Sequence, residues 1–140
     1  MKTGIILLFS NNEQEIKYTK FNNLKSKGTT KYCFVNNASN DKTLEKLKEI
    51  KENNLKNISI IDVKKNKGLH AAVKAGVRHL KNNGEFNPIV YLEFSKYSNH
   101  KKLEKILDSF INKKKIINFI SNNSSRNILR NVFALEQIIK

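Results

Sequence analysis

Two polar loops contain the side chains best placed for chemistry, and each loop follows a short apolar run. Asn36–Asn37 ends the run that starts at Tyr32, and Asn66–Lys67–Gly68 follows Ile58–Val63. An asparagine amide both donates and accepts hydrogen bonds, and a lysine can contact a phosphate. Both segments also have the composition of an ordinary turn, in which asparagine and glycine are favoured. The residue types therefore indicate either polar ligand binding or turns, and they do not decide between the two.

Several common catalytic arrangements are missing from the sequence. There is no G-x-x-x-x-G-K-[ST] or G-x-G-x-x-G segment, so the phosphate-binding loops of P-loop and Rossmann dinucleotide proteins are not present. There is also no G-x-S-x-G nucleophile elbow, and the three histidines have no partners at metal-ligand spacing. Cys33, the single cysteine, lies inside an apolar run. This position indicates a buried core thiol in a reducing compartment rather than a nucleophile.

Strand-like and helix-like patterns alternate along the chain, with short connections between them. Apolar runs predict strands at Ile5–Phe9, Tyr32–Val35, Ile58–Val63, Ile89–Phe94 and Ile116–Ile120. Helical spacing predicts helices over Glu13–Lys27, from Asp41 to about Asn53, over Leu69–Leu80 and Leu103–Ile111, and a last amphipathic segment, Ile128–Ile139. This alternation predicts a three-layer α/β fold, with a mostly parallel sheet of about five strands and helices on both faces. Residues 1–140 are expected to form a single domain.

The composition is strongly basic. There are 27 lysines and arginines against 12 aspartates and glutamates, which give a formal net charge of +15. Lysine, asparagine and isoleucine make up 61 of the 140 residues, a bias typical of an AT-rich genome, and only three residues are arginines. Along residues 42–52 lysines alternate with glutamates, which indicates a solvated helix face rather than a nucleic-acid surface. The charge still leaves an alternative function: a non-catalytic basic α/β module that binds a polyanion or an acidic membrane surface.

The sequence predicts no transmembrane segment. Met1–Glu13 contains one lysine and a short apolar run, and it lacks the small-residue cleavage site of a signal peptide. The apolar part of this segment is therefore predicted as a strand. The protein is expected in the cytoplasm, either free or bound peripherally to a membrane surface.

The polar loops resemble, in order and wording, the nucleotide-binding half of the family 2 glycosyltransferases, which have the Rossmann-like GT-A fold. Four segments carry the resemblance: Phe9–Glu13 (FSNNE), Val35–Thr43 (VNNASNDKT), Asn66–Gly76 (NKGLHAAVKAG) and Leu92–Ser95 (LEFS). A weaker likeness to polyprenyl-phosphate glycosyltransferases rests on Ser124–Ser125–Arg126 and Arg130. The similar segments extend from Gly4 to Arg130, which is nearly the whole chain.

The resemblance implies that the carboxyl ends of the strands bind a nucleotide-diphosphate sugar. An active member would transfer the sugar to an acceptor such as a lipid phosphate or a glycan. The resemblance implies nucleoside contacts from Ser10, Asn36 and Asn37, diphosphate contacts from Asn66, Lys67 and Gly68, and a metal or ribose contact from Glu93. No catalytic residue is assigned, because the family's general base belongs to an acceptor-binding half that follows this region.

Two departures from the family pattern weaken the expected chemistry. Asn36–Asn37 stands in place of an acidic pair, although an amide still accepts hydrogen bonds. Glu93 and Ser95 stand in place of an Asp-x-Asp metal motif, so one carboxylate and one neutral hydroxyl replace two carboxylates. Because Mg²⁺ and Mn²⁺ prefer anionic oxygens, the sequence predicts a degraded metal site. Both an active enzyme and a non-catalytic sugar-nucleotide-binding protein are consistent with this pattern.

Overall fold

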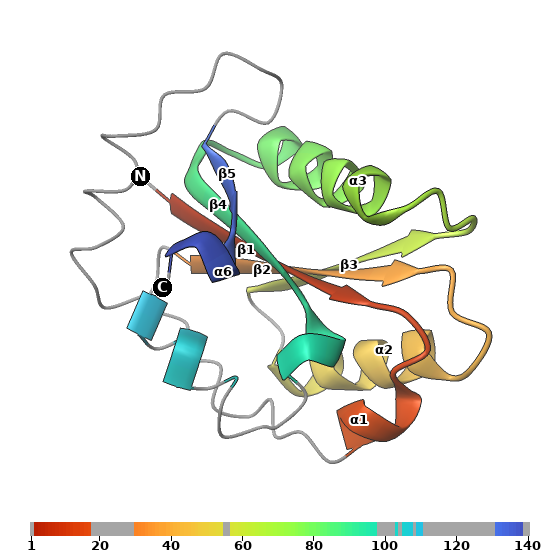
Figure 1. Cartoon of the computed structure of the whole chain (residues 1–140). Helices are drawn as coiled ribbons and strands as arrows, with labels where there is room; N and C mark the ends of the chain where they lie inside the picture. Colours follow the sequence, from red (N-terminus) through yellow and green to blue (C-terminus); the bar gives the residue numbers. More distant parts are fainter. Residues whose placement is uncertain are drawn as a thin grey trace.

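A parallel β-sheet runs through the centre of the molecule (Figure 1). The computed structural model of the chain describes residues 2–17, 30–54, 57–97, 103, 105–107, 109–110 and 131–138. The strands are β1 (Lys2–Phe9), β2 (Thr30–Asn37), β3 (Ile58–Val63), β4 (Phe86–Glu93) and β5 (Val132–Ala134). Their order is β3-β2-β1-β4-β5, and every neighbouring pair is parallel. The predicted α/β fold with a parallel sheet is therefore confirmed.

Helices cover both faces of the sheet. The described helices are α1 (Glu13–Lys17), α2 (Thr43–Asn54), α3 (Leu69–Asn82), the 3-10 helix η1 (Phe94–Tyr97) and α6 (Leu135–Ile138). Figure 1 shows α3 on one side of the sheet, and α1 and α2 on the other side. The described residues between positions 103 and 110 are also helical, as predicted for Leu103–Ile111. In the part of the chain that the structure describes, no helix is long and apolar enough to cross a membrane.

Alternating strand residues divide the core into two clusters. The cluster under α3 contains Ile6, Leu8, Cys33, Val35, Ala72, Val73, Val77, Leu80, Phe86 and Ile89. The cluster on the other face includes Ile5, Leu7, Phe9, Tyr32, Phe34, Leu47, Val90 and Leu92. Burial raises the pKa of the Cys33 thiol to about 12, so this thiol is protonated at neutral pH. Cys33 is therefore a core residue rather than a nucleophile, as the sequence predicts.

The packing of α3 against the sheet confirms its predicted periodicity. Its buried residues are Ala72, Val73, Gly76, Val77 and Leu80. A Cβ atom at Gly76 would lie only 3.0 Å from Ile6 Cδ1, so the glycine lets α3 lie close to β1. Because α3 begins directly after the β3 loop, this packing also fixes its first turn at the carboxyl edge of the sheet.

The last strand differs from the prediction. β5 lies within Ile128–Ile139, which the sequence predicts as one amphipathic segment without a strand. The backbone of β5 pairs with β4 in the register Ile89↔Val132 and Val90↔Phe133. This pairing with a distant strand overrides a local pattern that is too short to separate helix from strand. The predicted strand Ile116–Ile120 and the end of the predicted helix Glu13–Lys27 lie outside the described residues.

Three boundaries also differ from the prediction. β4 begins at Phe86, before the predicted start at Ile89, and its register with β1 shifts between Lys2 and Gly4. This irregularity accommodates Pro88, which has no N–H to donate to the sheet. The predicted strand Ile89–Phe94 ends one residue early, because Phe94 begins the 3-10 helix η1. Finally, Asp41 precedes α2 and does not lie in its first turn.

Candidate functional site

A cavity of about 190 Å³ opens at the carboxyl edge of the sheet, where β1, β2 and β4 end. Its walls are formed by Leu8, Phe9, Ser10, Asn12, Asn37, Asn66, Leu69, Glu93 and Ser95. Because β1 is the central strand, its exit loop is flanked by those of β2 and β4. The structure brings five of the predicted site residues into this wall: Ser10, Asn37, Asn66, Glu93 and Ser95. Asn36, Lys67 and Gly68 are not part of the wall.

Asn37 is the buried amide of this cavity. The residue is only 8% exposed, and its Oδ1 has no hydrogen-bond partner among the described residues. An unpaired buried acceptor is unfavourable by about 1–3 kcal/mol, and such atoms are rare in folded proteins. A ligand N–H or O–H that donates to this oxygen would remove the penalty. The geometry therefore favours a donor group of a ligand at Asn37.

Asn36 lies on the opposite face of β2, because successive strand residues point to opposite sides. Its Nδ2 donates to Asp62 Oδ1 at 3.0 Å, and its Oδ1 accepts from the Ser39 hydroxyl at 2.5 Å. Both ends of the amide are thus bonded within the protein. Asn36 lines a separate cavity of about 290 Å³, together with Asp62 and Lys64. The structure therefore does not bring Asn36 and Asn37 to one cavity.

Asp62 is a carboxylate at this edge that the sequence analysis did not select. It is opposite Asn36 in the register between β2 and β3, and Lys64 Nζ lies 2.5 Å from its Oδ2. The hydrogen bond from Lys64, with a smaller contribution from Asn36, lowers the pKa of Asp62. The ionised carboxylate therefore fixes the orientation of the Asn36 amide. The available signal was a lone aspartate near the end of the mainly apolar run ISIIDV.

Hydrogen bonds connect the β1–α1 loop to the β2–α2 region. Asn11 N donates to Ser39 Oγ at 3.0 Å, and Asn40 N donates to Asn11 Oδ1 at 2.7 Å. Asn12 N donates to Thr43 Oγ1 at 2.9 Å. Asn11 has a φ of 53°, a left-handed conformation in which asparagine is enriched. The loops that border the cavity are therefore fixed to one another before any ligand binds.

Asp41 stabilises the start of α2 from outside the helix. Its Oδ1 accepts from Thr43 N at 3.0 Å, and its Oδ2 accepts from Glu13 N at 3.3 Å. Burial acts to raise the pKa of Asp41, but the hydrogen bonds from Thr43 and Glu13 outweigh burial and lower the pKa. Asp41 is therefore a structural residue that joins the two loops.

The β3–α3 loop places backbone N–H groups at the carboxyl edge. Asn66 Oδ1 accepts from Gly68 N at 2.9 Å, and Gly68 is the N-cap of α3 with a φ of 99°. No side chain caps the first turn of this 14-residue helix among the described residues. A helix amino terminus with free N–H groups attracts anions. Lys67 is exposed beside it and adds positive charge, whereas the exposed His70 is not in the cavity wall.

Glu93 and Ser95, the residues at the predicted metal-motif position, both lie in the cavity wall. Glu93 is half-buried in the cavity wall, and Ser95 is exposed there. No group of three or more His, Cys, Asp or Glu residues that could hold a metal ion occurs among the described residues. Hydrogen bonding to Glu136 at 3.1 Å, and then attraction to Glu93, raise the pKa of Lys96. One carboxylate with a lysine near it does not fit the two-carboxylate arrangement of a strong divalent site.

The order of the loops and the all-parallel sheet are consistent with an α/β fold of the GT-A type. A family model for glycosyl transferase family 2 matches residues 5–130. Because the match covers far more than half of the 140 residues, the chain belongs to glycosyl transferase family 2. The resemblance seen in the loop sequences is therefore confirmed.

The fold is also similar to the crystal structure of S. aureus TarS 1-349, with a TM-score of 0.50 and 22% sequence identity. The similar region covers 77% of this chain and 32% of that chain, so this chain spans about a third of its length. This likeness supports the GT-A-like fold and nothing more specific. A comparison with curated proteins finds no match.

The predicted residues and the observed cavity wall do not correspond fully. Ser124–Ser125–Arg126 and Arg130, which carry the weaker polyprenyl-phosphate likeness, lie outside the described residues. Asn12, which belongs to the family-like segment Phe9–Glu13 but is not among the predicted contact residues, is also in the cavity wall. Leu69, expected only as a core position of α3, also reaches the cavity wall. These two residues have ordinary structural roles, so their types and spacing carried no signal of a site.

Proposed function

We propose that this chain binds a nucleotide-diphosphate sugar in the cavity at the carboxyl edge of the sheet. The unpaired, buried Oδ1 of Asn37 is the observation that carries the proposal. A nucleoside presents N–H and O–H donors, which fit this oxygen and the carboxylate of Glu93. Ser10 lies in the same wall and supplies a further hydroxyl. The nucleoside would occupy the cavity, with the diphosphate directed toward the first turn of α3.

The β3–α3 loop supports the diphosphate part of the proposal. Asn66 holds Gly68 N in a tight turn, and the amino terminus of α3 follows at once. Lys65 and Lys67 are exposed on the same loop and carry positive charge. Backbone N–H groups and lysines stabilise phosphate oxygens without a metal ion. In this proposal they replace most of the charge that Mg²⁺ or Mn²⁺ would supply, because Glu93 and Ser95 form an incomplete donor set.

The reaction that follows from the family is transfer of the sugar from the nucleotide diphosphate to a hydroxyl or phosphate of an acceptor. A lipid phosphate or a glycan is the proposed acceptor class, and no described residue is assigned as the catalytic base. The alternative of a basic polyanion-binding module has less support on α2. There Lys46 forms an ion pair with Glu49 at 3.7 Å, as expected for a solvated helix face.

Isothermal titration calorimetry with UDP-sugars and GDP-sugars tests donor binding. We expect saturable binding of at least one of these nucleotide sugars. Its Kd measured with Mn²⁺ should differ by less than about threefold from its Kd measured with EDTA and no metal ion. If no UDP-sugar or GDP-sugar gives detectable heat with or without Mn²⁺, the proposal is wrong. If binding appears only with Mn²⁺, the chain binds the nucleotide sugar, but the proposal that it does so without a metal ion is wrong.

A charge variant at the metal-motif position sharpens this test. Ser95→Asp would restore a second carboxylate beside Glu93, so Mn²⁺ should then improve the affinity for the bound nucleotide sugar. Asn53→Asp adds the same single negative charge at an exposed position of α2 and serves as the matched control. An equal Mn²⁺ response in both variants would show that the added charge, and not its position, is responsible.

A further inference from the structure

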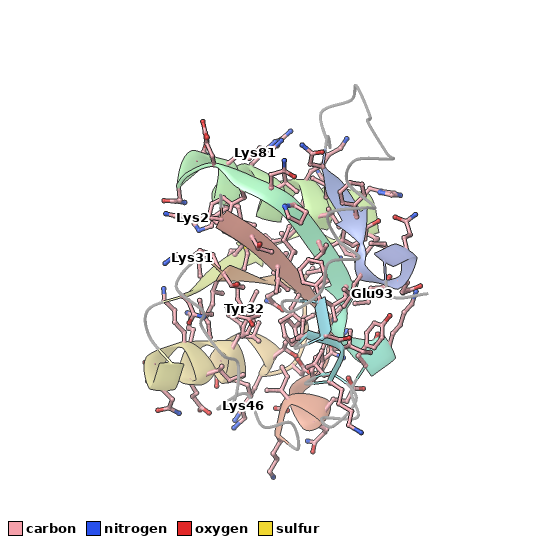
Figure 2. The ribbon with its side chains drawn as sticks, turned by 90° about the vertical axis from the view of Figure 1, so that its left-hand side faces the viewer. Lys2, Lys31, Tyr32, Lys46, Lys81 and Glu93 are labelled. Carbon is pink, nitrogen blue, oxygen red and sulfur yellow. The ribbon has the colours of Figure 1, made fainter. Side chains whose placement is uncertain are left out.

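A further cavity, of about 310 Å³, lies at the amino edge of the sheet. Its walls are formed by residues of four strands and of the last turn of α3, and the polar members are Lys2, Lys31, Asn57, Ser59, His79 and Asn83. Figure 2 shows Lys2 and Lys31 at one end of the sheet and Glu93 at the other end. β1 connects the two edges through eight residues, a span of about 23 Å. A ligand at the amino edge is therefore outside the proposed nucleotide site.

Strand alternation explains why polar residues gather there. Lys31 is two residues before Cys33 on β2, and Lys2 is two residues before Gly4 on β1, so both lie on the face that α3 covers. Ser59 is opposite Cys33 and shares this face. The strand residues under α3 are apolar, but they give way to polar residues at Lys2, Lys31 and Ser59. At these positions α3, which ends at Asn82, does not cover the sheet fully.

Asn57 lies in the wall of this cavity and has an unpaired donor atom. The residue is only 7% exposed, and its Nδ2 has no hydrogen-bond partner among the described residues. Its backbone carbonyl accepts from Tyr32 N at 2.7 Å, which holds the residue against β2. A buried amide N–H without a partner is unfavourable, and a ligand oxygen would satisfy it.

The charge of the cavity is positive. Lys2 and Lys31 are in the wall, and none of the described wall residues has a carboxylate side chain. The carboxyl terminus of α3 opposes the effect of these lysines, because the free carbonyl groups at the end of a helix repel anions. However, Asn83 reduces this effect: its Nδ2 donates to His79 O at 2.7 Å, and its backbone N donates to Leu80 O at 3.0 Å.

The cavity also has an apolar wall, formed by Ile58, Leu80 and Phe86. We propose that the amino-edge cavity binds an organic phosphate monoester, with the phosphate between Lys2, Lys31 and Asn57 and an apolar or aromatic group against Leu80 and Phe86. Two ammonium groups and one amide donor match the several oxygens of a phosphate dianion. The volume is larger than an inorganic phosphate requires, so the remaining space is available for the apolar group. This proposal does not depend on nucleotide-sugar binding at the other edge.

The test is a titration of the ¹⁵N-labelled full chain with phenyl phosphate, followed by NMR. The Asn57 side-chain NH₂ signals, identified by their loss in Asn57→Asp, should shift and saturate, together with the backbone signals of Lys31 and Asn83. Phenol, which lacks the charge, should bind at least about tenfold more weakly, since two charge-assisted contacts are missing. Shifts confined to the residues of the carboxyl edge, or equal affinities for phenol and phenyl phosphate, would refute the proposal.

Two variants locate the phosphate. Lys2→Met with Lys31→Met should weaken phenyl phosphate binding by at least about tenfold. Lys46→Met with Lys51→Met removes the same charge from α2, on the opposite face of the sheet (Figure 2). This double variant is the control for a general loss of charge and should leave the affinity within about twofold. Asn57→Asp should also weaken binding, because a carboxylate repels phosphate. Circular dichroism melting shows that each variant is folded, and an unchanged Kd in the folded double-lysine variant contradicts the proposed site.

Discussion

The two edges of the sheet contain the same residue type in opposite chemical roles. Asn37 at the carboxyl edge and Asn57 at the amino edge are both more than nine-tenths buried, and each leaves one amide atom without a partner among the described residues. The free atom is an oxygen acceptor in Asn37 and a nitrogen donor in Asn57. The neighbouring charges follow the same division, with Glu93 beside Asn37 and Lys2 and Lys31 beside Asn57.

This difference follows from the common direction of parallel strands, which gives the two edges of the sheet different chemical groups. At the carboxyl edge the chain leaves the strands through loops that start helices, so backbone N–H groups of α3 stand beside the acceptors Asn37 and Glu93. This arrangement suits the proposed ligand, which has both donor groups and phosphates. At the amino edge α3 ends, and positive charge has to come from lysine side chains. We expect the two sites to differ in ligand class for this reason.

The largest effect should come from removing the acceptor at the carboxyl edge. We expect Asn37→Leu to weaken nucleotide-sugar binding by about fivefold to 150-fold, since one buried hydrogen bond of about 1–3 kcal/mol is lost. Calorimetry with the best-binding sugar nucleotide measures the change. Asn53→Ala, on the exposed end of α2, is the control and should not change the Kd. If Asn37→Leu is folded and binds as tightly as wild type, Asn37 is not part of the nucleotide site.

The backbone at the start of α3 offers the next test of the comparison. Gly68 and Gly84 both have positive φ values, 99° and 149°, and they lie near opposite edges. A Cβ at either position is strained, and we expect each alanine variant to lower the free energy of unfolding by about 1–2 kcal/mol in urea denaturation. Only Gly68→Ala should also weaken nucleotide-sugar binding, because it displaces the first turn of α3. If both variants bind the nucleotide sugar equally well, the amino terminus of α3 does not contact the diphosphate.

The response to acid should also differ between the edges. Hydrogen bonds lower the pKa of Asp62, so its ionised form stabilises the fold above the unfolded-state pKa, and this stabilisation is lost as the pH falls through the folded-state pKa. Replacing Asp62 with Asn should therefore destabilise the protein at pH 6 more than at pH 3, measured by urea denaturation. Glu85→Gln, at an exposed position before β4, is the matched charge control. A pH-independent effect of Asp62→Asn would contradict the stabilising role of the ionised Asp62.

The smallest expected effect concerns the coupling between the two sites. Saturating phenyl phosphate should change the Kd of the nucleotide sugar by less than about twofold, because about 23 Å separate the edges. Calorimetry with and without phenyl phosphate measures this. Competition between the two ligands would mean that both bind the same edge, and it would contradict the assignment of the amino-edge cavity.

Local sequence patterns predicted most of the regular structure. The helical spacing from Leu69 to Leu80 and the continuous apolar run in β1 correspond to elements of the structure, because each pattern follows from burying one face of a helix or both faces of a strand. β5 could not be predicted in this way. Three residues, Val132–Ala134, form a strand through pairing with β4, which is distant in the sequence.

The composition of the candidate site could also be predicted in part. The order of loops beginning at Ser10, Asn36 and Asn66 indicated the family, which the family match confirms. Asn36 and Asn37 are neighbours in the sequence and were predicted to contact one nucleoside, yet they line different cavities in the structure. Strand alternation separates them, and Asp62 from the neighbouring strand binds the Asn36 amide. Their functional roles remain predictions.

The sequence by itself determined the fold class, the family and the positions of the polar loops, because these depend on patterns between neighbours along the chain. Only the tertiary structure decided which polar atoms are bonded and which are free. Asn36, Asn37 and Asn57 are chemically identical, but their partners come from strand register and burial, which join residues far apart in the sequence. For this reason the amino-edge cavity, built from four strands and the end of α3, had no signal in the sequence.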